Sequence, residues 1–161
     1  MNRIHVMLLA AILLLGLVGC GPAESEPQPK NFTFSYNGTQ ITMHSDADPI
    51  IAALGEPKSY TEEPSCAFDG MDKTYYYGSF YLSTYPLDGQ DHVKGLWFAD
   101  DSIATGDGIR IGNTQADVER IFGADCFSGT NAYSQFKGES KLTILLTDGI
   151  VSSIQYEAVI G

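Results

Sequence analysis

Hydrophobic and polar residues alternate along six stretches of this chain, and that period of two predicts β-strands. The stretches are rich in Tyr, Phe, Val, Ile and Trp, which favour strands. They cover residues 73–80, 80–86, 92–99, 132–137, 141–147 and 150–158. The first three stretches form one set and the last three a second set. Asp88-Gly89 and Asp148-Gly149 lie between the last two stretches of each set, and Asp-Gly favours a two-residue hairpin turn. The pattern therefore predicts two antiparallel meanders of three strands.

Two short helices are predicted ahead of these meanders, because apolar residues recur there at spacings of three and four. These residues are Ile50, Ala53 and Leu54 in the first helix, and Val118, Ile121 and Phe122 in the second. Gly55 and Gly123 follow the helices where a C′ glycine is expected. The expected N-caps are Ser45 and Asn113. A short strand is expected before each helix, at 40–44 and 108–112.

The two helix-and-meander segments match each other in order, which suggests an internal repeat. At an offset of 68 residues, the matches are Ile41, Met43, Ile50 and Gly55 with Ile109, Ile111, Val118 and Gly123. We therefore expect an α+β fold of two tandem repeats, each a short helix packed on a three-stranded antiparallel β-meander, sharing one sheet. Repeat one spans about 40–100 and repeat two about 108–158, within one folded domain at 31–161. The alternative is that two unrelated α+β units share their apolar spacing by chance.

The N-terminal residues differ from the rest of the chain. Arg3 precedes an almost unbroken apolar run at 6–18, which is too short for a helix that crosses a bilayer. A signal peptide is therefore predicted over 1–19. Residues 20–30 carry three Pro and no large apolar residue, a composition typical of a disordered tether. The alternative to a lipoprotein signal peptide is an ordinary signal peptide or a weak membrane anchor, with Cys20 present by chance.

Leu17-Val18-Gly19-Cys20 resembles the lipobox of bacterial lipoproteins, where a small residue precedes the Cys that receives diacylglycerol. This resemblance implies cleavage before Cys20, lipidation of Cys20 and anchorage on the extracytoplasmic side of the cell membrane. Residues 111–123, ending in Phe122-Gly123, are similar to the SmpA/OmlA (BamE-type) lipoproteins, and the tandem arrangement resembles the β-lactamase-inhibitor-protein-like fold. The first repeat departs from that pattern, because residues 45–48 replace its Gly-containing turn. The resemblance implies binding, scaffold or inhibitor roles by analogy and assigns no functional residue.

The acidic composition excludes one class of partner. The 161 residues include 20 Asp and Glu and 9 Lys and Arg, which gives a net charge of −11. Loss of Arg3 with the signal peptide would leave 8 basic and 20 acidic residues, a net charge of −12. Nucleic acid binding needs clustered Lys and Arg, so nucleic acid is not expected as a partner. Anionic lipid would repel the folded body, so the N-terminal lipid is expected to hold the protein at the membrane.

The sequence offers candidate sites but no constellation for catalysis. Cys66 and Cys126 remain after lipidation, and either a disulfide between them or two free thiols is open. A Cys/His pair could use His44 or His92, but nothing in the sequence brings these residues together. The aspartates at 88–91 could ligate calcium, yet the EF-hand spacing is absent and Asp-Gly also suits a turn. We expect no enzyme activity, no cofactor and no metal.

Aromatic residues are concentrated between positions 75 and 98. In strands of period two, half of these side chains face the core and half face outward. The candidate binding face consists of Tyr75, Tyr77, Tyr81 and Trp97, because Tyr and Trp are enriched at interface hot spots. The alternative is that these residues pack against the core or occupy the strands as ordinary β-formers.

These observations together predict a membrane-anchored, non-catalytic extracytoplasmic lipoprotein. Its expected role is a protein-binding or scaffold module of the cell envelope, which uses the concave face of the sheet with aromatic residues as anchors. A small-molecule or divalent-cation-binding lipoprotein is the alternative, indicated by the acidic loops. The expected partners are the membrane, through the N-terminal lipid, and an envelope protein. The oligomeric state stays open.

Overall fold

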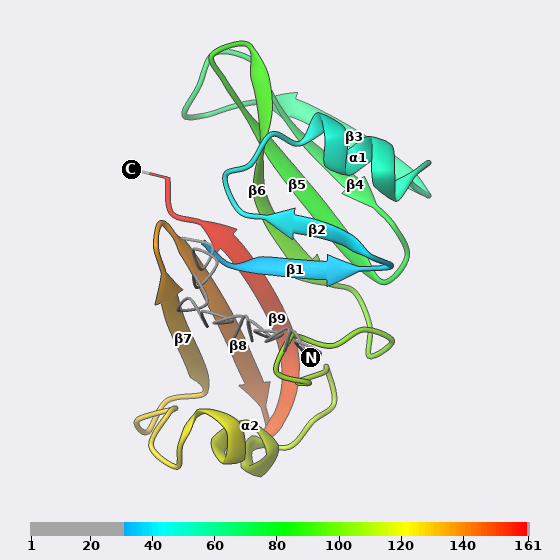
Figure 1. The fold of residues 1–161 in the computed structure, drawn as a ribbon. Helices are drawn as coiled ribbons and strands as arrows, with labels where there is room; N and C mark the ends of the chain where they lie inside the picture. Colours follow the sequence, from blue (N-terminus) through cyan, green and yellow to red (C-terminus); the bar gives the residue numbers. More distant parts are fainter. Residues whose placement is uncertain (1–30, 161) are drawn as a thin grey trace, which may run out of the picture.

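A computed structural model describes residues 31–160, and strands dominate this part of the chain (Figure 1). The elements, in order, are β1 (Thr33–Tyr36), β2 (Thr39–Thr42), α1 (Asp48–Leu54), β3 (Ser59–Pro64), β4 (Met71–Tyr76), β5 (Phe80–Leu87), β6 (Gln90–Phe98), α2 (Gln115–Phe122), β7 (Ala132–Lys137), β8 (Ser140–Thr147) and β9 (Ile150–Ala158). The predicted signal peptide, lipobox and tether lie outside the described residues.

Seven strands form one antiparallel sheet in the order β3-β4-β5-β6-β9-β8-β7, and β1 and β2 form a separate hairpin. The strands from β3 to β6 follow one another as a meander across one half of the sheet (Figure 1). The second meander joins them through its last strand, because β9 pairs with β6. This connection makes β3 and β7 the two edges of the sheet.

The predicted architecture of two α+β repeats is wrong. The fold is mostly β, and its two helices span only seven and eight residues. The first half of the chain supplies four strands and a separate hairpin, whereas the second half supplies three strands. Residues 108–112 form turns and loop instead of the expected strand. Hydrophobic periodicity also missed β3, because all six of its residues are exposed and no alternation marks them.

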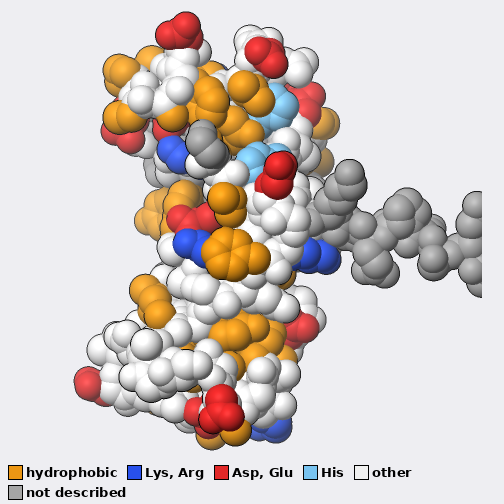
Figure 2. Space-filling view, turned by 90° about the vertical axis from the view of Figure 1, so that its left-hand side faces the viewer, with side chains coloured by type: hydrophobic (Ala, Val, Ile, Leu, Met, Phe, Trp, Pro, Cys, Tyr) orange, Lys and Arg blue, Asp and Glu red, His pale blue; other side chains and the backbone are white. Residues whose placement is uncertain are grey.

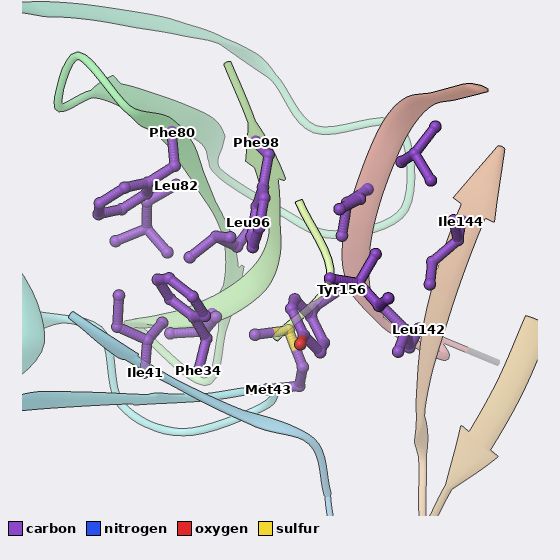
Figure 3. Close-up of a cluster of buried hydrophobic side chains, with 14 of the residues drawn as sticks. Phe34, Ile41, Met43, Phe80, Leu82, Leu96, Phe98, Leu142, Ile144 and Tyr156 are labelled. Atoms are coloured by element: carbon purple, nitrogen blue, oxygen red, sulfur yellow. The ribbon is translucent and has the colours of Figure 1, made fainter. Parts of the chain in front are cut away.

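The β1–β2 hairpin, and not a helix, covers the middle of the sheet. Phe34 and Ile41 from this hairpin, and Met43 after it, point toward the sheet (Figure 3). The Phe34 ring centroid lies 5.4 Å from that of Phe98 and 6.1 Å from that of Tyr156 on β9. Other sheet residues of this core are Phe80, Leu82, Leu96, Leu142 and Ile144. Because core residues occupy alternate positions of each strand, the opposite face carries its own set of side chains.

The helices end where predicted but begin elsewhere. Gly55 and Gly123 end α1 and α2, with φ of 80° and 102°. The N-cap is Ala47 for α1, without a capping side chain, and Thr114 for α2. The expected caps form other hydrogen bonds: Ser45 Oγ donates to the carbonyl oxygen of Thr42, and Asn113 Oδ1 accepts from the N–H of Arg110. Neither helix among the described residues is long and apolar enough to cross a membrane.

The predicted hairpin turns at Asp88-Gly89 and Asp148-Gly149 are confirmed. In both hairpins the residues that flank the turn pair directly across the two strands. The four turn residues have φ between 52° and 79°, as a type I′ turn requires. These turns set the register of β5 with β6 and of β8 with β9, and the register decides which side chains face each side of the sheet.

Candidate binding surface

One face of the large sheet is not covered by the helices or by the β1–β2 hairpin, and we call it the open face. The register places one row of residues on it across six strands, from β4 to β7. The row is Tyr76, Tyr81, Trp97, Gln155, Thr143 and Ser134. Tyr76, Tyr81 and Trp97 are called the aromatic strip below. Directly opposite residues of antiparallel strands have Cβ atoms about 4.5–5.5 Å apart, so the strip is continuous.

Tyr76 and Tyr81 stack on each other at the β4–β5 end of the strip. Their ring centroids are 4.6 Å apart and the ring planes differ by 22°. Tyr81 nevertheless stays 40% exposed. Each ring restricts the rotamers of the other, so contact with a partner would cost little further conformational entropy. The pair therefore offers aromatic surface that is already ordered.

Trp97 lies over the backbone of Gly95, two residues earlier on β6. A Cβ atom on Gly95 would lie 3.2 Å from Cη2 of the indole and 2.9 Å from the carbonyl oxygen of Tyr156. At its other end, the indole Nε1 donates to Oε1 of Gln155 at 2.8 Å. The glycine makes room for the ring and the hydrogen bond orients it. Trp97 is thus held against the sheet while it remains partly exposed.

A polar network extends the strip toward β7. Gln155 Nε2 donates to Glu157 Oε2 at 3.1 Å, and Lys141 Nζ lies 3.2 Å from the same oxygen. Phe136 on β7 is the cross-strand partner of Lys141. At 66% exposure, Phe136 is the most exposed large hydrophobic residue in the part of the chain that the structure describes. The open face therefore stays amphipathic as far as its edge.

A second charged pair borders the strip on β6. The register shift between Ser83 and Thr84 leaves Lys94 as the extra residue of a β-bulge, and its Nζ pairs with Oδ2 of Asp72 on β4. Figure 2, which shows the side of the molecule at the left of Figure 1, has hydrophobic side chains in separate groups, the middle one next to acidic and basic side chains. Lys94 and Asp72 thus neutralise each other beside the strip.

The four predicted binding residues are divided between the two faces of the sheet. Tyr81 and Trp97 lie on the open face. Tyr75 and Tyr77 instead pack against the core, and burial raises the pKa of both phenols. The prediction was wrong for these two because the turn after β4 breaks the alternation, so the parity of one strand does not carry into the next. Tyr76, which the prediction omitted, takes their place beside Tyr81.

The sequence left a disulfide or two free thiols open for Cys66 and Cys126, and the structure holds them as free thiols. Cys66 is exposed in the loop after the edge strand β3, whereas Cys126 follows α2, near the other half of the sheet (Figure 1). Burial raises the pKa of the Cys126 thiol. The predicted lipidation site, Cys20, lies outside the described residues.

His44 and His92 meet at one end of the open face, where they surround Tyr85 and not a cysteine. His44 Nδ1 lies 2.9 Å from Tyr85 Oη, and its Nε2 lies 2.7 Å from the carbonyl oxygen of Glu139. His92 Nδ1 donates to the His44 carbonyl oxygen at 3.1 Å. A carbonyl oxygen only accepts, so we assign the proton of neutral His44 to Nε2 and let Tyr85 donate to Nδ1. Figure 2 shows the histidines beside hydrophobic side chains. Because these hydrogen bonds join the segment after β2 to β5, β6 and the β7–β8 turn, the imidazoles have a structural role.

Residues 31–160 contain no candidate metal site. No group of three or more His, Cys, Asp and Glu side chains in this part of the chain is close enough to hold an ion. Asp88 occupies its hairpin turn, and Asp91 pairs with Lys73 at 2.5 Å.

No family model, no curated protein and no solved structure matches the chain.

Proposed function

We propose that this protein is a non-catalytic, lipid-anchored binding module of the cell envelope, which recognises a protein partner through the open face. The observation that carries the proposal is the aromatic strip of Tyr76, Tyr81 and Trp97 on a sheet face that the other described elements leave uncovered. Exposed aromatic side chains provide large, rigid contact areas and are enriched among binding hot spots.

The surroundings of the aromatic strip support a protein interface. Specific interfaces combine an aromatic centre with a polar rim, and charged residues are depleted at the centre. Gln155 and Thr143 continue the row as polar residues. Two ion pairs lie beside the strip, Lys94 with Asp72 and Lys141 with Glu157. Because these four charges are already paired, a partner can cover them without leaving any of the four isolated.

The net charge favours a partner surface with basic residues. Residues 31–160 contain 7 Lys and Arg and 18 Asp and Glu, a net charge of −11. Arg and Lys side chains also bind over the faces of Trp and Tyr rings, within about 6 Å of the centroid. Opposite charge accelerates association and is screened by salt. We therefore expect the association rate to fall as ionic strength rises.

Membrane attachment through Cys20 is the second part of the proposal, and it rests on the lipobox-like residues 17–20. Intact mass spectrometry of the protein extracted from its own membrane tests it. We expect a chain that starts at Cys20 and carries added mass at that residue. Cys20→Ala should stop lipidation and leave the precursor uncleaved. An unmodified Cys20 in the wild-type protein would overturn the anchor without affecting the argument about the open face.

Site-specific photo-crosslinking in the native envelope tests the binding surface. The photoreactive p-benzoylphenylalanine replaces Tyr81 on the open face. In the matched control it replaces Tyr60, which is exposed to 45%, against 40% for Tyr81, but pairs with Tyr75 and so faces the other side of the sheet. We expect one discrete protein adduct from position 81, none from position 60, and a weaker adduct when Trp97→Ala is added. Identical adducts from both positions, or no effect of Trp97→Ala, would contradict the proposal.

A further inference from the structure

The two edge strands of the large sheet differ in how they are protected. β3 has the sequence Ser-Tyr-Thr-Glu-Glu-Pro, with two adjacent carboxylates and a terminal proline. Charges and proline are the devices that prevent an edge strand from pairing with another chain. β7 has the sequence Ala-Tyr-Ser-Gln-Phe-Lys, without proline, and it pairs with β8 in unbroken register. Its only charged residue, Lys137, is the last of the strand, and Lys137 Nζ lies 6.0 Å from the centroid of the Phe32 ring. β7 therefore has neither the proline nor the adjacent charges that protect β3.

The register of β7 shows which of its peptide groups are free. A two-residue turn at 138–139 joins β7 to β8, so the odd-numbered residues of β7 bond to β8 and the even-numbered ones point away from the sheet. Thr130 Oγ1 occupies the outward groups of Ala132, accepting from its N–H at 3.3 Å and donating to its C=O at 2.9 Å. Within residues 31–160, no backbone hydrogen bond occupies the outward N–H or the outward C=O of Ser134 or Phe136.

The side chain of Phe136 adds apolar surface at the same edge. It is 66% exposed and lies on the open face, opposite Lys141. Among the described elements, none lies beyond β7 in the sheet order, and Figure 1 shows this strand as the outermost one. A strand added there would place a side chain directly opposite Phe136, where cross-strand aromatic and aliphatic pairs stabilise a sheet. The edge thus offers both main-chain and side-chain contacts.

We propose that an extended segment of the protein partner pairs with β7 as an eighth strand of the sheet. The segment hydrogen-bonds to the peptide groups of Ser134 and Phe136 and places an apolar side chain against the Phe136 ring. It carries no proline where its N–H groups face β7, because proline has none to donate. Strand addition of this kind takes its affinity from main-chain bonds and its specificity from alternate side chains. The inference rests on the proposed function, since the same partner continues over the open face.

A second copy of this chain fits the edge less well than a partner segment does. Two β7 strands pairing about Gln135 would share one short strand edge, and specific interfaces bury at least about 1,000 Å². Each folded body also carries a net charge of −11, so two copies repel each other. A partner that occupies both the edge and the aromatic strip covers a larger and continuous surface, and the acidic body attracts it if it is basic.

The experiment places p-benzoylphenylalanine at Phe136 in the full-length protein in its native envelope, and at Tyr60 on the protected edge as the matched control. We expect position 136 to give an adduct of the same mass as position 81, and position 60 to give none. Ser134→Pro removes an outward N–H that β8 does not use, so it should weaken the adduct roughly two- to ten-fold. The melting temperature should change by less than about 3 °C, because proline is tolerated on an exposed edge.

Amide hydrogen exchange of the captured complex provides a second measurement, which also applies if Ser134→Pro does not fold. Strand addition should slow exchange at Ser134 and Phe136 but leave Tyr133 and Gln135, already bonded to β8, nearly unchanged. An adduct at position 81 without one at 136, or equal slowing of all four amides, overturns the edge inference and leaves the proposed function intact. No adduct at either position overturns both. An adduct of twice the chain's mass at position 136 assigns the edge to a second copy and overturns the inference.

Discussion

Replacement of Gly95 by alanine tests whether the sheet holds Trp97 in place. Gly95 does not have a positive φ, so the backbone accepts alanine and only the available space opposes it. The new Cβ would lie 2.9 Å from the carbonyl oxygen of Tyr156 and 3.2 Å from Cη2 of the indole. The carbonyl belongs to the backbone of β9 and cannot move without disturbing the sheet. The indole ring, or the pairing of β6 with β9, therefore has to shift.

Two opposing effects determine the size of the change. Removing a glycine lowers the entropy of the unfolded chain and stabilises the protein by about 0.4–1 kcal/mol. Overpacking at a close contact costs about 1–3 kcal/mol. The net expectation is a loss of about 0–2.6 kcal/mol in unfolding free energy. For a domain of this size, about 3–5 °C of melting temperature per kcal/mol gives a decrease of up to about 13 °C.

Tryptophan fluorescence during thermal and urea unfolding provides the assay, because Trp97 is the only tryptophan of the chain. We expect Gly95→Ala to lower the midpoint and to shift the emission of the folded state to the red, as the displaced ring meets water. Gly106→Ala is the matched control, since its Cβ has no heavy atom within 4 Å and its φ is not positive. A Gly95→Ala variant that is as stable as wild type with unchanged emission would refute the packing of the ring on Gly95.

Three further predictions concern other parts of the fold. His44→Ala should lower the urea-unfolding free energy by about 1–3 kcal/mol, because it removes hydrogen bonds to Tyr85 and to a backbone carbonyl; unchanged stability would contradict the structural role. Hydrogen bonds from Thr114 hold the pKa of Asp117 below its ordinary 3.8, so Asp117 stabilises the fold above about pH 4 and this contribution is lost as pH falls through the lowered pKa. Asp117→Asn should therefore be less stable than wild type at pH 7, and the difference should shrink in acid; a constant difference would contradict the assignment. A reductant should leave the melting temperature unchanged, and a thiol reagent should label exposed Cys66 before Cys126; a melting temperature that falls on reduction would indicate a disulfide.

Features that depend on neighbouring residues were predictable. The hairpin turns at 88–89 and 148–149 were correct because a type I′ turn needs positive φ at two adjacent positions, which Asp-Gly supplies. Gly55 and Gly123 marked the helix ends for a similar local reason. The strand β3 was not predictable from periodicity, because an exposed edge strand buries no face and so has no alternating pattern.

The candidate site was predictable only in its composition. A concentration of Tyr and Trp was evident, and two of the four expected residues, Tyr81 and Trp97, lie on the open face. The face of each tyrosine was not evident, because the turn between β4 and β5 resets the alternation. As a result, Tyr75 packs against the core and Tyr76 lies on the open face. The role of Gly95 was equally hidden, since a glycine that accommodates a ring has no local signature.

The sequence by itself determined the strands of high β propensity, their turns, the helix ends and the acidic charge of the folded body, because these are properties of short segments or of composition. The tertiary structure alone decided that β6 pairs with β9, that the β1–β2 hairpin covers the core, and that β7 is left as an edge. Those outcomes depend on which apolar faces can be buried together, and this involves residues far apart in the chain, such as Phe34 and Tyr156. The open face and its free edge are what remains once that burial is complete.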